Sequence, residues 1–128
     1  MAEIARTFLM FQGQAEEAYR FYISTFTSAS GSSIRRFGDD PAGKVMLAEL
    51  SIGGHKILLN DSPIEHAFGF TPRVSIFLDC EDEASVDRYA HALGDGGKTL
   101  MPVANYGFSR RFAWVQDRFG VTWQLNLP

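Results

Sequence analysis

The sequence has little cysteine, little excess charge of one sign and no long hydrophobic run. Its single cysteine, Cys80, excludes an internal disulfide framework and a zinc site built from several cysteines. No apolar stretch approaches the roughly 18 residues that a membrane-spanning helix needs. The first residues lack the pattern of a signal peptide, because their apolar stretch is short and acidic residues follow it. We therefore expect a cytoplasmic protein that enters no membrane.

The charge balance argues against nucleic acid as a partner. Lys and Arg total 12 against 15 Asp and Glu, which gives a net charge of -3. No basic excess exists to neutralise phosphates or an anionic membrane surface. A chain of 128 residues with 45% hydrophobic and 21% charged residues is typical of one globular domain. The 13% aromatic content, with 11 Phe, can fill a core or line an apolar cavity.

The first half predicts a strand, a helix and three further strands. Apolar and β-branched residues over 4–11 indicate a buried strand, and apolar residues at helical spacing follow. Gly53-Gly54 marks a hairpin turn. The predicted elements are strands at 4–11, 33–37, 45–52 and 55–61 and a helix at 15–26. Residues 62–72 have two Pro, one Gly and no period, so they read as a linker.

The second half repeats this order. The predicted elements are a strand at 73–80, a helix at 81–92, and strands at 98–103, 110–116 and 121–127. The sequence of segment 54–60 (GHKILLN) also aligns with that of segment 120–126 (GVTWQLN). We therefore predict an α+β fold in which two tandem βαβββ modules, 1–61 and 73–128, form one domain over 1–128. Such modules make a curved, mostly antiparallel sheet with outer helices, and a ligand would lie on its concave face.

Several segments resemble a known family. They are 11–18 (FQGQAEEA) followed by Phe21-Tyr22, 74–78 (VSIFL) with Asp87-Arg88, and 114–125 (WVQDRFGVTWQL). Together with the repeat, they resemble the vicinal oxygen chelate superfamily, which includes glyoxalase I, extradiol dioxygenases and bleomycin-resistance proteins. The closer resemblance is to its PhnB-like branch, often labelled 3-demethylubiquinone methyltransferase-like. The resemblance implies this fold, a small organic molecule as partner, and a homodimer.

The resemblance also implies four positions for a divalent metal, from the first and last strand of each module. Aligning the motifs places Thr7, Leu58, Ser75 and Gln124 there. Leu58 has no donor atom and the other three are neutral, so we expect no metal and no other cofactor. The three histidines lie at a strand start, in the linker and on a helix, where we expect surface roles; a metal site that includes His66 is the alternative.

The predicted pocket comes from alternate residues of the strands on the concave side. It consists of Thr7, Leu9, Phe11, Leu58, Asn60, Ser75, Phe77, Trp114, Thr122 and Gln124. These residues combine apolar surface with a few polar groups, as small-molecule sites do. The choice depends on strand phase, and a shift by one residue would exchange each side chain for its neighbour.

Other candidate chemistry finds little support in the sequence. The segment 94–99 (GDGGKT) lacks the first Gly of a phosphate loop and follows a helix, so it reads as a helix end. Gln12-Gly13-Gln14 has one Gly where a methyl-donor site needs a Gly-rich turn, so no methyl-donor motif supports methyl transfer. Cys80 has no evident His neighbour, and we expect an inert core thiol.

The sequence leaves three functions open. The first is a metal-independent binding protein that takes a small organic molecule into the concave face. The second is a divalent-metal-dependent enzyme of lyase, isomerase or dioxygenase type. The third is an interaction module whose pocket is filled by its own rings. The catalytic residues, and whether the pocket forms within one chain or across a dimer, stay open.

Overall fold

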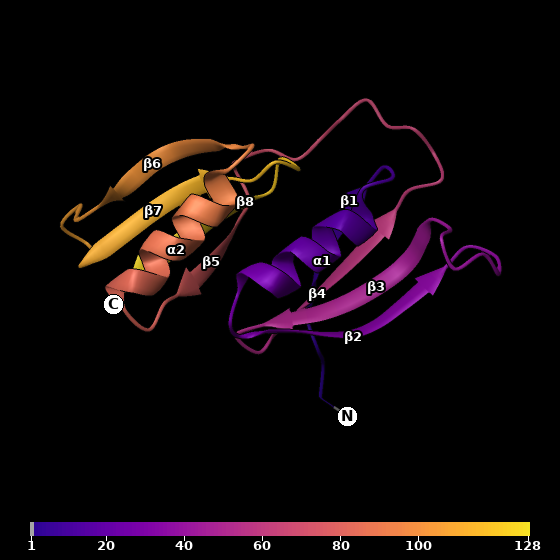
Figure 1. Cartoon of the computed structure of the whole chain (residues 1–128), viewed down its shortest axis with the longest axis horizontal. Helices are drawn as coiled ribbons and strands as arrows, with labels where there is room; N and C mark the ends of the chain where they lie inside the picture. Colours follow the sequence, from indigo (N-terminus) through magenta and orange to yellow (C-terminus); the bar gives the residue numbers. More distant parts are fainter. Residues whose placement is uncertain (1) are drawn as a thin grey trace. The chain divides into compact units, whose positions relative to one another are not determined.

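The computed structural model describes residues 2–128, and the chain divides into two compact units (Figure 1). The first unit ends at His66, and the second comprises Ala67–Pro128. The division lies inside the predicted linker 62–72. Each unit has the element order strand, helix, strand, strand, strand. The predicted α+β fold of two βαβββ units is therefore confirmed, and the eight strands form two sheets of four.

The first unit forms a mixed sheet with the strand order β1-β4-β3-β2. Its elements are β1 (Thr7–Phe11), α1 (Ala15–Thr25), β2 (Ala29–Arg36), β3 (Val45–Ile52) and β4 (His55–Asp61). β1 pairs with β4 in parallel, and the other pairs are antiparallel. The first strand begins later than predicted, and β2 is longer than the segment 33–37.

The second unit repeats this topology with the order β5-β8-β7-β6. Its elements are β5 (Ser75–Asp79), α2 (Glu83–Gly94), β6 (Lys98–Ala104), β7 (Arg111–Gln116) and β8 (Thr122–Leu127). β5 and β8 are parallel. Pro102 lies in β6 at the edge of the sheet, the place in a sheet where proline is tolerated.

One helix covers one face of each sheet. α1 buries Ala18 and Tyr22, and α2 buries Val86 and Leu93, each against the sheet of its own unit (Figure 1). The strand residues on these faces are mostly apolar and fully buried, and they form the two cores. Among the described residues each unit has a single helix, so the other face of each sheet has no helix of its own unit over it.

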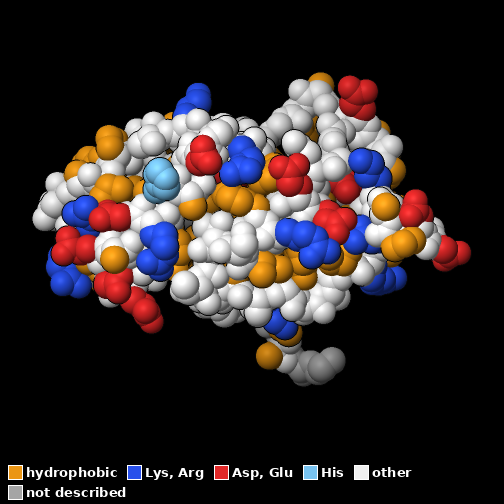
Figure 2. Space-filling model, viewed as in Figure 1, with side chains coloured by type: hydrophobic (Ala, Val, Ile, Leu, Met, Phe, Trp, Pro, Cys, Tyr) orange, Lys and Arg blue, Asp and Glu red, His pale blue; other side chains and the backbone are white. Residues whose placement is uncertain are grey.

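The surface mixes charges of both signs. On the face shown in Figure 2, acidic and basic side chains lie among each other, as the small net charge leads one to expect. No helix within residues 2–128 is long and apolar enough to span a membrane.

Candidate functional site

The second unit brings its five predicted pocket residues to one face of its sheet. The residues of β8 that alternate with Thr122 and Gln124 are fully buried on the side of α2, so these two side chains point to the opposite face. In the strand register, Ser75 lies beside Thr122. Gln124 lies between Phe77 and Trp114. We call this surface the open face of the second sheet.

A chain of three hydrogen bonds crosses this open face. The Nε1–H of Trp114 donates to Ser75 Oγ at 3.1 Å, and Ser75 Oγ lies 2.7 Å from Thr122 Oγ1. The Thr122 hydroxyl donates to the carbonyl oxygen of Val74 at 2.9 Å. Because an indole N–H can only donate and a carbonyl can only accept, the Ser75 hydroxyl must donate to Thr122. The indole therefore reaches from β7 across β8 to β5. Thr122, in the middle of this chain of bonds, is only 1% exposed.

Aromatic rings make a second bridge over the same strand. Phe77 on β5 and Phe112 on β7 lie on either side of β8, with ring centroids 6.4 Å apart. Phe112 also meets Phe108 edge-on at 4.9 Å and Tyr106 edge-on at 6.1 Å. Edge-on packing is a favourable geometry for aromatic rings. The rings form an apolar wall along the open face.

The Gln124 side chain emerges between these two bridges. One of its cross-strand neighbours, Trp114, belongs to the hydrogen-bonded bridge, and the other, Phe77, belongs to the aromatic bridge. Gln124 is half-buried, and its amide makes no hydrogen bond to any part of the chain that the structure describes. The open face therefore presents an unengaged amide within an aromatic frame.

In the first unit, the predicted orientation of β1 is wrong by one residue. Leu9 and Phe11 are buried beside the residues of β4 that face α1, and Thr7 lies on this side too. Leu58 and Asn60 point to the opposite face. The strand reads TFLMF, with apolar residues on both sides, so its pattern does not fix which side faces the helix.

Sequence reasoning missed Phe8 and Met10, which lie in register with Leu58 and Asn60 on the face away from α1. Phe8 is 48% exposed. Aligning the two repeats on their glycine turns matches Leu58 of β4 with Gln124 of β8. Phe8 lies in register with Leu58, and Phe77 lies in register with Gln124, so Phe8 matches Phe77. Phe77 is similarly exposed, at 55%. The internal repeat was therefore the signal that could have located Phe8.

The two repeats differ in the hydrogen bonding of an asparagine that occupies matched positions, Asn60 and Asn126. In the second unit, Asn126 Nδ2 donates to Asp79 Oδ1 at 2.8 Å. The same alignment matches this pair with Asn60 and Met10 in the first unit, and a thioether is a poor acceptor. Asn60 Oδ1 is buried and, within residues 2–128, has no hydrogen-bond partner. The first unit thus lacks the asparagine–carboxylate bond of the second unit, and the carbonyl oxygen of its own asparagine, Asn60, is left unpaired within the described residues.

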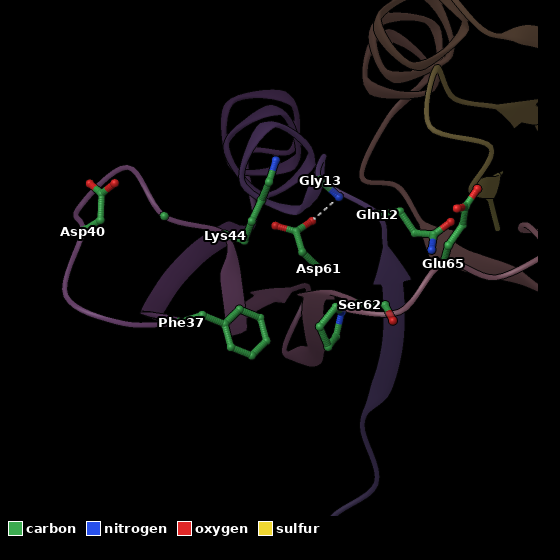
Figure 3. A pocket seen from close by; sticks show the side chains of 10 residues that line it. Gln12, Gly13, Phe37, Asp40, Lys44, Asp61, Ser62 and Glu65 are labelled. Atoms are coloured by element: carbon green, nitrogen blue, oxygen red, sulfur yellow. Dashed lines mark hydrogen bonds between the residues drawn. The ribbon is translucent and has the colours of Figure 1, made fainter.

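A hollow of about 830 Å³ lies in the first unit, where β1 and β4 end (Figure 3). Asp61, 4% exposed, forms its inner wall. Its Oδ1 accepts the N–H groups of Gly13 at 2.8 Å and Ala15 at 2.9 Å. Its Oδ2 accepts the N–H of Val45 at 3.0 Å. This carboxylate caps α1, because Gln14 at the N-cap makes no side-chain capping bond.

The rim of the hollow carries charges of both signs. Figure 3 shows Lys44 beside Asp61, with Glu65 farther along the rim and the ring of Phe37 below Lys44. Lys44 makes no ion pair with the described residues. A lining with one cation, several carboxylates and one ring selects no particular class of ligand.

An ion-pair network holds the loop that bounds this hollow. Arg36, at the end of β2, donates to both carboxylate oxygens of Glu16 at 2.8 and 3.0 Å and to the carbonyl oxygen of Gly43 at 2.9 Å. Arg20 donates to the same carboxylate at 2.8 Å. The bonds to Arg36, and then those to Arg20, lower the pKa of Glu16 to about 2.

This lowered pKa predicts an acid-sensitive contribution to stability. The contribution is fully present above the ordinary carboxyl pKa and is lost as the pH falls towards about 2. Because the pair is partly exposed and screened, we expect about 1 kcal/mol. Glu16→Gln should lower the free energy of urea unfolding at pH 7, and its difference from wild type should vanish near pH 2. A difference that stays constant over this range would contradict the assignment.

The sulfur and imidazole groups do not assemble into a reactive or metal-binding cluster. Cys80 is buried, and its burial raises the pKa of the thiol to about 11, so it is protonated at neutral pH. His66 Nε2 lies 3.0 Å from Ser62 Oγ, and His55 Nε2 lies 2.8 Å from Thr7 Oγ1. In the described chain, no three His, Cys, Asp or Glu side chains are grouped to hold a metal, at His66 or elsewhere.

Solved structures place this architecture in a known class. The PhnB protein from Bacillus cereus is 40% identical, over 98% of this chain and all of that one, with a TM-score of 0.91. A protein from Pseudomonas aeruginosa is 28% identical over 98% of both chains, with a TM-score of 0.88. The fosfomycin resistance protein FosX from Mesorhizobium loti, 16% identical over 100% of this chain and 93% of its own, shares the fold with a TM-score of 0.67. The paired βαβββ units thus have the glyoxalase-like fold of these proteins.

Sequence comparison narrows this class to one family. The family model described as 3-demethylubiquinone-9 3-methyltransferase matches residues 3–126, and the chain belongs to this PhnB-like family. An uncharacterized protein from Mycobacterium bovis is 28% identical over 123 residues, which cover 89% of this chain and 76% of that protein.

The residues at the superfamily's four metal positions do not fit a divalent ion. Leu58 has no donor atom, and Thr7 lies on the face covered by α1. The Ser75 oxygen already accepts the Trp114 indole N–H, and its proton is engaged with Thr122. Only the Gln124 amide is left, and one neutral oxygen binds a divalent ion weakly.

Proposed function

We propose that this chain is a metal-independent binding protein for a small organic molecule, which it takes on the open face of the second sheet. The observation that carries the proposal is the unengaged amide of Gln124 between the Trp114–Ser75 bridge and the Phe77–Phe112 bridge. Apolar surface with a few converging polar groups is typical of small-molecule sites. The homodimer and the cytoplasmic location expected from the sequence stay predictions.

The reaction in the family's name has no support in this site. The turn after β1 is the place where a methyl-donor cofactor would need free backbone N–H groups. There the N–H of Gly13 donates to the buried carboxylate of Asp61. We therefore infer binding rather than methyl transfer.

Binding of an apolar fluorescent dye, 8-anilinonaphthalene-1-sulfonate, tests the proposed face. Phe77→Ser removes an exposed ring from the frame without opening the core, and we expect the dye's affinity to fall about tenfold. Phe68→Ser is the matched control, because Phe68 in the linker is similarly exposed, at 68%. Fluorescence titration of the two variants and wild type gives the comparison.

Two results would contradict the proposal. One is an equal loss of dye affinity in the Phe77→Ser and Phe68→Ser variants. That result would show that the dye does not bind specifically on the open face. The other is a stoichiometric divalent metal in the purified protein, measured by elemental analysis. That result would favour a lyase, isomerase or dioxygenase of the same superfamily.

A further inference from the structure

We propose that Gln124 selects planar ligands that carry an N–H and a C=O on adjacent ring atoms, that is, cyclic amides and imides. This inference rests on the proposed function, because it specifies the ligand class for the same open face. It concerns what the amide can pair with, whereas the proposed function concerns only where a ligand binds.

The frame around Gln124 favours a flat guest. The Trp114 indole is held across β8 by its bond to Ser75, and the Phe77 and Phe112 rings span the same strand farther along. Rings fixed by packing or hydrogen bonds offer stacking surface at little entropic cost. A planar molecule between these bridges would meet aromatic carbon on both sides.

The other polar groups that flank Gln124 on β5 and β8 are already engaged. Ser75 and Thr122 give both hydroxyl protons to the hydrogen-bonded chain. Asn126, two residues along β8, donates to Asp79. The Gln124 amide, by contrast, makes no hydrogen bond with the described residues and adjoins apolar rings, so a guest that excludes water there must replace the amide's bonds to water.

The amide sets the pattern of the guest's edge. A glutamine side chain presents one acceptor, the carbonyl oxygen, and one donor group, the NH₂, side by side. A cyclic amide has the complementary pair, since its N–H and C=O lie on the same edge of a flat ring. A site built to hydrogen-bond a substrate group discriminates strongly against the analogue that lacks it.

Two bicyclic probes of the same shape test this inference. 2-Quinolone has the adjacent N–H and C=O, and quinoline has neither. We expect wild type to bind 2-quinolone about tenfold more tightly, as a paired amide requires. Gln124→Leu should bring the ratio of the two affinities to about one. Ligand-observed NMR titration measures both affinities.

Two further variants sharpen the test. Gln116→Leu is the matched control, because Gln116 lies opposite Thr122 on the same face and should leave the ratio unchanged. Gln124→Glu keeps the shape but offers only acceptors. The affinity of this variant for 2-quinolone should therefore fall. Its affinity for 2-aminoquinoline should rise, because the protonated ring nitrogen and the amino group of that probe are both donors.

The outcomes separate the inference from the proposed function. If wild type binds both probes equally and Phe77→Ser weakens both, the face binds ligands but the amide does not select them, and the inference is overturned. A loss of selectivity in Gln116→Leu as large as that in Gln124→Leu would overturn it as well. If wild type binds neither probe and no dye, the proposed function itself fails.

Discussion

Replacing Asp61 with alanine is expected to lower the free energy of unfolding by about 3 to 5 kcal/mol. The buried carboxylate accepts three backbone N–H groups, from Gly13, Ala15 and Val45. Alanine leaves all three donors without a protein acceptor, and α1 loses its cap because Gln14 supplies none. Urea unfolding followed by circular dichroism measures the change.

Hydrogen exchange locates the effect of this change. The amides of Gly13, Ala15 and Val45 should lose protection in Asp61→Ala more than the rest of the first unit. Asp61→Asn should cost less, because its oxygen can keep the first two bonds while its NH₂ faces the Val45 N–H. Asp40→Ala is the control, since among the described residues that exposed carboxylate accepts only the N–H of Ala42. Equal losses in Asp40→Ala and Asp61→Ala would refute this account of the carboxylate.

The second large effect is expected at Gly97, where Gly97→Ala should cost about 3 kcal/mol. A Cβ at this position would lie 2.0 Å from the carbonyl oxygen of Gln116 and 2.8 Å from the carbonyl carbon of Asp117. Both neighbours are backbone atoms at the end of β7, so neither can turn away as a side chain could. The start of β6 would have to separate from β7.

Tryptophan fluorescence suits this measurement, because both tryptophans, Trp114 and Trp123, lie in the second unit. Trp123 donates to Asp117 at 2.9 Å, close to the predicted disturbance. Gly69→Ala is the control, since a Cβ there meets nothing within 4 Å. It should be neutral or slightly stabilising. Similar unfolding midpoints for the two variants would show that the close backbone approach at Gly97 does not destabilise the Gly97→Ala variant.

The sequence was sufficient to predict the fold because its signals agree with one another. Glycine turns, two helical stripes and the matched segments 54–60 and 120–126 indicate the same repeated unit. The phase of β8 was also predictable, since TWQLNL alternates polar and apolar residues. The phase of β1 was not, because TFLMF is apolar on both sides, and so Leu9 and Phe11 were predicted on the wrong face.

The Trp114–Ser75 bridge lay beyond prediction for a different reason. The bond joins β7 to β5, which become near neighbours only because β8, the last strand of the chain, lies between them. Periodicity within a strand gives the face of a side chain, but not the order of strands in the sheet. The predicted residues Ser75, Phe77, Trp114, Thr122 and Gln124 could thus be assigned to one side, whereas their partners could not.

The hydrogen bonds from Trp114 through Ser75 and Thr122 to Val74 all run in one direction. They therefore limit the hydrogen-bond donors that the open face can offer to a ligand. Ser75 and Thr122 look like a pair of hydroxyl donors in the sequence, yet the Ser75 hydroxyl donates to Thr122 and the Thr122 hydroxyl donates to the carbonyl oxygen of Val74. What they retain is lone pairs. An anion would therefore find no hydrogen-bond donor in these two hydroxyls, whereas a compound that carries its own N–H or O–H group could donate to the Ser75 oxygen.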